Sequence, residues 1–399
     1  MRPSAHCFYC DQARGRPEHH EKLPGWHDLA EGLAFGTPMN PESTHVSLEN
    51  AFYTSSECFA DECDTYFTQN WVSVGLASTL APNSISPTRI ANIPILLTRT
   101  SRGELHAFHN ACRHRGIKLV HDSCADVERV TCPYHAWTYD LSGKFLGAPY
   151  FSGKPGSNVP GELKDALGLR PIRHHVWFDM IFVDLSGTAP PFEDWIAPLA
   201  EYWRPFDESR IRLLSLTGYE VDANWKLVCE NFLDNYHVPF VHRQAGGPRT
   251  AVNYENITLS PDIFGFTLPK GELDKPKADW LPTLDLDEDL RDAQFFFCLF
   301  PNTLIAITAS WFQVISVQAN AANRSSEFLG LYAMAEIPDE GRADADRFSE
   351  VMNRINQQDI ELLASLQEGR GSPASEEGVL APYWDECVRR FHDRIRATP

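Results

Sequence analysis

Long apolar segments are missing from this 399-residue sequence. No run approaches the roughly 18 consecutive apolar residues that a membrane-spanning helix needs. The N-terminal residues MRPSAHCFYC also lack the apolar core of a signal peptide. We therefore expect a cytoplasmic protein with no membrane partner.

Positive charge is scarce. The sequence has 35 Lys and Arg against 54 Asp and Glu, which gives a formal net charge of −19. A chain of this sign repels polyanions, so nucleic acid is not expected as a partner. The charge would suit a cationic substrate or a basic protein partner, although most of it is expected to be solvated surface.

Cysteines are few, 10 in all, and their scatter does not resemble a disulfide framework. In a reducing compartment the clustered cysteines are better explained as metal ligands than as crosslinks. A GxGxxG fingerprint after a strand, typical of flavin or nicotinamide binding, is also missing. If the protein performs redox chemistry, we expect its electrons to come from a separate protein.

The sequence divides into three regions. Residues 1–50 are polar and rich in Pro and His, and we expect an irregular lead-in that packs on the last domain. Residues 51–185 contain short strand-like runs separated by turn signals, which indicates an antiparallel β-domain. Residues 186–399 mix strands with helical patterns, which indicates an α+β domain. The helices are expected at about 195–206, 224–237 and 343–367.

Two short segments, ACRHRG and CPYHAW, each place one cysteine beside one histidine. The full spacing is Cys112-x-His114-x17-Cys132-x2-His135. A zinc site is one interpretation, but zinc sites usually pair cysteine with cysteine and histidine with histidine. In a Rieske [2Fe–2S] centre two thiolates bind one iron and two imidazoles bind the other, so each loop must supply one of each. The split spacing favours the Rieske centre.

A second set of metal-binding side chains lies in NWKLVCENFLDNYHVPFVH. His237 and His242 are five residues apart, and Pro239 between them is expected to end the helix there. Asp234 lies one helical turn before His237 and could orient its ring. A mononuclear iron that activates O2 needs two histidines and one carboxylate.

We expect that carboxylate on the C-terminal helix. Asp359 lies four residues after Ile355 and four before Leu363, within an apolar stripe at helical spacing. A carboxylate that faces the core is costly unless it is paired or bound to a metal. The alternative is that Asp359 lies at the edge of the stripe and reaches solvent. Three polar neighbours are predicted to point elsewhere, into solvent, namely Gln357, Gln358 and Glu361.

These motifs resemble those of the Rieske non-haem iron oxygenases, specifically their catalytic α subunits. CRHRG and CPYHAW are similar to the two cluster loops, except that Ala136 stands where the family usually has glycine, a change not expected to affect ligation. ENFLDNYHVPFVH is similar to the catalytic-iron motif, and QDIELLASLQ to the segment with the aspartate ligand. The resemblance runs from about residue 52 to about residue 391.

The resemblance implies a role for each matching residue. The implied cluster ligands are Cys112, His114, Cys132 and His135, and the implied iron ligands are His237, His242 and Asp359. Asp234 would bridge by hydrogen bonds to a cluster histidine, His135 or His114, of a neighbouring subunit. Asn231 and Tyr236 would line the iron pocket. Subunits of this family form rings, usually trimers, so we expect a homotrimer.

The resemblance also implies a fold and a function. The fold would be α+β, with an antiparallel β Rieske domain followed by a helix-grip (START-like) catalytic domain around a central antiparallel sheet. The function would be that of a terminal oxygenase, which takes electrons from NAD(P)H through a separate reductase, with or without a ferredoxin. It would use O2 to hydroxylate or oxidatively demethylate a small organic substrate.

The substrate is less well indicated. FFFCLFPNTLIAITASWFQ resembles the choline, carnitine and betaine mono-oxygenase branch, and aromatic cages suit quaternary ammonium groups. The alternative within the family is an aromatic substrate, hydroxylated on the ring or demethylated. From another class, the chain could be an electron-transfer or scaffold protein with an inactive second site. Four aromatic residues are expected to face either the cavity or the plain core, namely Phe264, Phe266, Trp311 and Phe312.

The N-terminus holds a zinc-like set. It consists of Cys7, Cys10, His19 and His20, but the two histidines are adjacent rather than three to five residues apart. An irregular terminus without a metal is the default expectation.

Overall fold

The structure, a computed structural model, describes residues 46–154, 156–157, 159–242, 254–268, 281–376 and 378–397. Most of the predicted lead-in lies outside them, as does the N-terminal set Cys7, Cys10, His19 and His20. In the described part of the chain, no helix combines the length and apolar character that crossing a bilayer would require.

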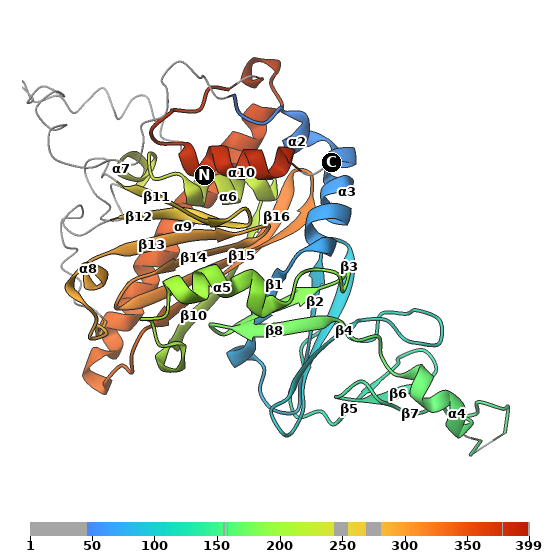
Figure 1. The fold of residues 1–399 in the computed structure, drawn as a ribbon. Coiled ribbons are helices and arrows are strands. Elements are labelled where there is room, and N and C mark those ends of the chain that lie inside the picture. Colours follow the sequence, from blue (N-terminus) through green and yellow to red (C-terminus); the bar gives the residue numbers. More distant parts are fainter. Residues whose placement is uncertain are drawn as a thin grey trace, which may run out of the picture. The chain divides into compact units, whose positions relative to one another are not determined.

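The first half of the described chain forms three small antiparallel sheets, with strand orders β1-β9-β8, β2-β3-β4 and β5-β6-β7 (Figure 1). The first strands are β1 (Val72–Leu76), β2 (Ser84–Ile90), β3 (Ile93–Arg99) and β4 (Leu105–His109). They are followed by β5 (Arg129–Thr131), β6 (Thr138–Asp140), β7 (Phe145–Gly147), helix α4 (Gly161–Lys164), β8 (Arg173–Trp177) and β9 (Met180–Asp184). One Cys/His segment lies between β4 and β5, and the other between β5 and β6.

Strands β8 and β9 form a tight hairpin whose turn lies within VWFDMIFVDL, one of the strand-like runs of residues 51–185. Its two-residue loop is Phe178–Asp179, with φ of 45° and 65°. Hairpin loops with two positive φ values usually carry Asn or Gly, so a phenylalanine gives no turn signal. The loop is held by Asp179, whose carboxylate accepts hydrogen bonds from Ser78 N (2.7 Å) and Tyr332 Oη (2.9 Å).

The second half is built on a seven-stranded antiparallel sheet of order β10-β16-β15-β14-β13-β12-β11. The strands are β10 (Arg212–Val221), β11 (Glu255–Ser260), β12 (Ile263–Leu268), β13 (Gln294–Leu299), β14 (Thr303–Ile307), β15 (Trp311–Ala321) and β16 (Arg324–Ala333). The helices are α5 (Phe192–Tyr202), α6 (Trp225–Leu233), α7 (Val238–Val241), α8 (Glu288–Arg291), α9 (Arg342–Arg370) and α10 (Glu386–Arg396). The predicted α+β class with a central antiparallel sheet is confirmed.

Both faces of this sheet are covered, and alternate residues of one strand face opposite sides. On β15, Ile315 and Val317 pack in the cluster that includes α6, α9 and α10. Phe312 and Val314 pack in the other cluster, which includes α5 and the β8–β9 hairpin. Figure 1 shows α6 and α10 on one side of the sheet and α5 on the other. The side that carries α6 and α9 is the side of the candidate catalytic centre.

Two N-terminal helices, α2 (Ala51–Thr54) and α3 (Ser56–Glu62), are joined to α6 by side-chain hydrogen bonds. Glu62 is buried and accepts hydrogen bonds from Lys226 Nζ (2.5 Å) and Trp225 Nε1 (2.8 Å). Tyr53 Oη donates to Glu230 Oε1 at 2.6 Å. These contacts tie the start of the predicted first domain to α6, so the division at residue 50 stays a prediction.

Candidate metal centres

The two Cys/His loops have the same backbone hydrogen bonds. The amides of Cys112 and Cys132 each donate to the carbonyl five residues later, at 2.9 and 2.8 Å. Their carbonyls each accept from the amide four residues later, that of Gly116 at 2.9 Å and that of Ala136 at 3.0 Å. Both of these residues have positive φ, 74° and 55°. Ala136 therefore adopts the left-handed conformation that glycine tolerates more easily.

The thiols and imidazoles of these loops differ in exposure. Cys112 and Cys132 are buried, and their side chains contact each other. His114 and His135 are exposed, and their ring centroids lie 4.7 Å apart. The ring of His114 also stacks on Trp137, with centroids 4.8 Å apart and planes 8° apart. Two adjacent thiols inside and two adjacent imidazoles outside fit a cluster with one iron of each kind.

A single zinc ion does not fit these loops, because its four ligands must converge on one point. Within the described ranges, one group of three His, Cys or acidic side chains has all its ligand atoms within 4.8 Å of one another. That group is His237, His242 and Asp359.

Tyr139, which was not predicted from the sequence, lies beside the buried thiols. Its Oη is 3.4 Å from Cys112 Sγ and accepts a hydrogen bond from Arg113 N at 3.1 Å. Burial and the contact with Cys112 raise the pKa of Tyr139, so the phenol keeps its proton and can donate it to the sulfur. Its position seven residues after Cys132 carries no recognisable signal.

The backbone around the two predicted iron-binding histidines differs from the prediction. Helix α6 is capped at its N-terminus by Asn224, whose side chain accepts from Lys226 N at 3.0 Å, and it ends at Leu233 rather than near His237. Pro239 lies in the first turn of α7 instead of ending a helix. The first turn leaves its amides without helical partners, so proline fits there. His237 and His242 flank this short helix.

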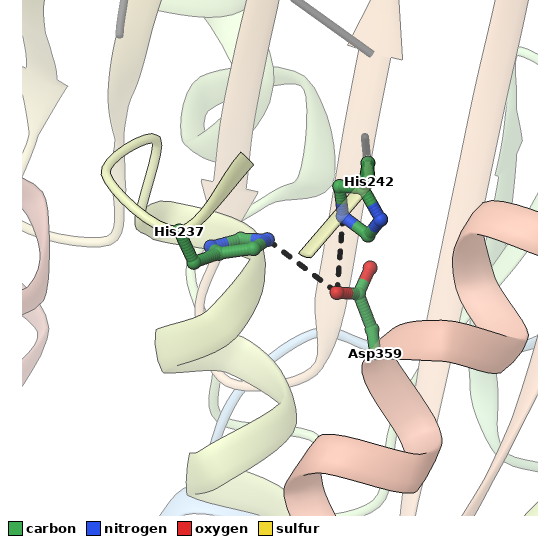
Figure 2. Close-up of side chains that lie close together, drawn as sticks. All are labelled: His237, His242 and Asp359. Atoms are coloured by element: carbon green, nitrogen blue, oxygen red, sulfur yellow. Dashed lines mark ion pairs between the residues drawn. The ribbon is translucent and has the colours of Figure 1, made fainter. Parts of the chain in front are cut away.

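The structure brings together the three side chains that the sequence predicts as iron ligands (Figure 2). His237 Nε2 and His242 Nε2 lie 3.4 and 3.2 Å from the same atom, Asp359 Oδ1. His242 is buried, and Asp359 is only partly exposed instead of reaching out to solvent. Two imidazoles and a carboxylate that converge from α7 and α9 fit one metal ion with positions left open.

Each histidine is held at its other nitrogen. His237 Nδ1 lies 3.1 Å from Asp234 Oδ2, and Asp234 Oδ1 accepts from Tyr236 N at 2.5 Å. His242 Nδ1 lies 3.0 Å from Gln358 Oε1. The prediction that Gln358 points into solvent was therefore wrong, because its position beside Asp359 on α9 lets it reach the far edge of the same ring. Gln357 and Glu361 are exposed as predicted.

The two remaining predicted pocket residues differ in what they contact. Asn231 Nδ2 donates to Asp359 Oδ1 at 3.5 Å, so Asn231 contacts the carboxylate itself. Tyr236 is 43% exposed, and its ring stacks on Trp384 with centroids 5.2 Å apart. Tyr236 thus faces the surface, which differs from the predicted position in the iron pocket.

The charges of the triad favour a cation at its centre. Burial lowers the pKa of His237, but its contacts with Asp234 and Asp359 raise that pKa further, to about 9. Burial raises the pKa of Asp359, but hydrogen bonds with His237 and His242 lower it overall. The three side chains therefore stabilise a positive charge between them. A proton on His237 supplies this charge here, and a bound metal ion could supply it instead.

A further carboxylate, Glu327, is buried on β16 within electrostatic range of the triad. It is 5% exposed and accepts a hydrogen bond from Asn356 Nδ2 of α9 at 2.7 Å. Burial raises its pKa to about 7 despite that hydrogen bond, and the negative charge of Asp359 adds to the effect. Glu327 was not predicted from the sequence, although it shares one face of β16 with the apolar Leu329 and Leu331.

The predicted aromatic residues divide between the two faces of the sheet. Phe264 and Phe266 pack in the cluster of α6 and α9, and Trp311 packs against it. Phe312 packs in the opposite cluster. Phe312 therefore does not belong to the side of the triad.

Two family models match the sequence. The model for the Rieske [2Fe-2S] domain matches residues 70–160, and the model for the ring hydroxylating alpha subunit (catalytic domain) matches residues 209–398. The chain belongs to the Rieske ring-hydroxylating α subunits. The two predicted cofactors, a Rieske [2Fe–2S] cluster and a mononuclear iron, are those of this family.

Several relatives of this α subunit have names that refer to quaternary ammonium compounds. It is 30% identical over 244 residues to the glycine betaine monooxygenase oxygenase subunit of Pseudomonas aeruginosa, which covers 58% of this chain and 55% of that protein. The chain thus matches about half the length of that relative. It is 24% identical over 375 residues to the chloroplastic choline monooxygenase of Spinacia oleracea, which covers 91% and 80%.

Solved structures share the fold. The quaternary ammonium Rieske monooxygenase CntA in complex with L-carnitine matches with a TM-score of 0.71 and 21% sequence identity. The match covers 88% of this chain and 96% of that chain.

Proposed function

We propose that this α subunit is the terminal oxygenase of a system that hydroxylates or oxidatively demethylates a small quaternary ammonium compound. O2 would be the oxidant, and a separate NAD(P)H-dependent reductase would supply the electrons. The observation that carries the proposal is the presence of two complementary ligand sets in one chain, the Cys/His loops and the converging triad. An electron carrier with an inactive second site would not need a triad whose histidines are both oriented by hydrogen bonds.

Under this proposal each ligand set holds one cofactor. The cluster would be bound by Cys112, His114, Cys132 and His135, and the mononuclear iron by His237, His242 and Asp359. When bound, the cluster would supply single electrons and the mononuclear iron would activate O2. Asn231 would hold the carboxylate of Asp359, and Asp234 and Gln358 would each keep a proton on the nitrogen that faces away from the metal.

Two observations support a cationic substrate over an arene. The relatives named above are described as glycine betaine and choline monooxygenases. Glu327 is a buried acid on the triad side of the sheet, and a permanent cation nearby would favour its ionised form. An arene would gain nothing from a carboxylate kept at this position. We propose that Glu327 offsets the charge of the ammonium group.

The test is a substrate screen with a matched neutral partner. Substrate-stimulated O2 consumption is measured with a surrogate reductase for glycine betaine, choline and carnitine, together with formaldehyde release. 3,3-Dimethylbutanol has the shape of choline without its charge and serves as the neutral control, and toluene represents the arenes. We expect O2 consumption that is coupled to product formation only with a cationic substrate. Coupled turnover with toluene but none of the cations would move the assignment to the aromatic branch.

The assembly proposal is that copies of this chain dock head to tail. Near the cluster loops, Tyr134 and Tyr150 are 54% and 64% exposed. Near Asp234, Tyr236 and Phe240 are 43% and 58% exposed. Two different apolar surfaces that cover each other form a heterologous contact, which gives a ring such as a trimer when the rotation between neighbouring copies closes. Asp234, itself partly exposed, would then reach a cluster histidine of the next subunit.

A further inference from the structure

We propose that Gln358 is a positioning residue that selects the metal-binding tautomer of His242 and so sets the affinity of the triad for Fe(II). This inference rests on the proposed iron site. Gln358 is only partly exposed, and its Oε1 lies 3.0 Å from Nδ1 of the buried His242.

The chemistry of the contact decides which nitrogen can bind the metal. An amide oxygen only accepts hydrogen bonds, so Nδ1 of His242 must carry the proton. The lone pair is then on Nε2, the atom that faces Asp359 Oδ1 at 3.2 Å. If the amide turned over, its NH2 group would donate to Nδ1, and the ring proton would move to Nε2. Nε2 could then no longer bind a metal ion.

Helix α9 thus holds both edges of the His242 ring. Consecutive helical residues point about 100° apart, and here Gln358 reaches Nδ1 while Asp359 reaches Nε2. His237 is held differently, because its Nδ1 faces the carboxylate of Asp234 in the chain segment just before it. A carboxylate can only accept, whereas an amide can accept or donate. Of Gln358 and Asp234, only Gln358 can therefore reverse the direction of its hydrogen bond to the histidine.

The test compares two substitutions of similar size. Gln358→Leu removes the acceptor, and Gln358→Glu keeps an acceptor that cannot turn over. The matched control is Gln357→Leu, which changes the exposed neighbour on the same helix. Each protein keeps its Rieske cluster, the mononuclear metal is removed with a mild chelator, and Co(II) is titrated back as the spectroscopic probe. The cluster absorbance reports that the fold is intact.

Removal of such an outer hydrogen-bond partner typically weakens metal binding about 10- to 100-fold. We expect that loss for Gln358→Leu, and near wild-type affinity for Gln358→Glu and Gln357→Leu. In the Co(II) form, the shifted exchangeable N–H proton of His242 should remain in Gln358→Glu and be lost by exchange in Gln358→Leu. This proton signal would not respond to a change in packing alone.

Two outcomes would overturn the proposal. One is wild-type Co(II) affinity in Gln358→Leu, and the other is equal weakening in both variants, which would mean that packing rather than the acceptor matters. If Gln358→Leu does not fold, the proton signal in wild type and Gln358→Glu decides, because both must show it. Failure of the proposed iron site itself would give a different result. In that case His242→Ala would bind as much Co(II) as the wild-type protein.

Discussion

Replacement of Glu327 by glutamine should stabilise the fold, and by an amount that depends on pH. The pKa of this carboxyl is raised from 4.5 to about 7, chiefly by burial. The folded state therefore binds the proton more tightly than the unfolded state. Below pH 4.5 both states are protonated and the acid costs nothing. Between pH 4.5 and 7 the folded state must keep the proton or bury a charge, so wild-type stability falls as the pH rises.

The pKa difference converts to free energy at about 1.4 kcal/mol per unit, so the full cost above pH 7 is about 3 kcal/mol. Glutamine has a similar shape, keeps an oxygen for the hydrogen bond from Asn356 and does not ionise. We expect Glu327→Gln to exceed wild type by about 1 kcal/mol at pH 5.5 and by about 3 kcal/mol at pH 8.

The assay is urea unfolding of both proteins at several pH values, with the mononuclear metal removed. Glu350→Gln, an exposed substitution on α9, is the control and should show no pH-dependent difference. With metal bound, the charge of Asp359 is offset and the gain should shrink. The same variant should bind the cationic substrate more weakly, although it folds better. A stability difference that stays constant from pH 5.5 to pH 8 would refute the reasoning.

Three other substitutions test the remaining parts of the two centres. Asp359→Ala should lose the mononuclear iron and turnover while it keeps the visible spectrum of the cluster, and full turnover would show that another carboxylate binds the metal. Asp234→Asn should keep cluster, iron and oligomer but transfer electrons to the mononuclear site far more slowly in single-turnover experiments; an unchanged rate of cluster oxidation would exclude the bridging role. Ala136→Gly should raise stability by about 1 kcal/mol, because it relieves the positive φ of 55° at that position. A lower unfolding midpoint with an intact cluster would contradict this last prediction.

Features that depend on short sequence distances were predictable. The spacing of Cys112, His114, Cys132 and His135 reflects loop geometry, and the structure repeats one turn around both cysteines. The position of Asp359 followed from helical spacing and from the cost of a carboxylate in the core. The α+β class followed from the strand and helix patterns, and the central antiparallel sheet was implied by the resemblance to the family.

Features that depend on contacts between distant elements were not predictable. Periodicity places a residue on a helix face but does not tell which edge of a neighbouring ring it reaches, so Gln358 was assigned to solvent. The hydrogen bond of Glu327 comes from α9, so the environment of this residue could not be predicted from the pattern of its own strand. The end of α6 at Leu233 depends on the side chain of Asp234, which accepts from Tyr236 N instead of allowing another turn.

The outward position of His114 and His135 also bears on how long the protein survives in use. Buried thiols are shielded from oxidants and acid, but an imidazole at the surface can be protonated and released from its metal. In a ring of subunits this edge would be covered by the next copy. Dilution separates the copies and exposes the edge, so we expect the cluster to bleach faster in dilute solution than in concentrated solution at the same oxygen level. The lifetime of the cluster would then depend on the assembly and not on the single chain.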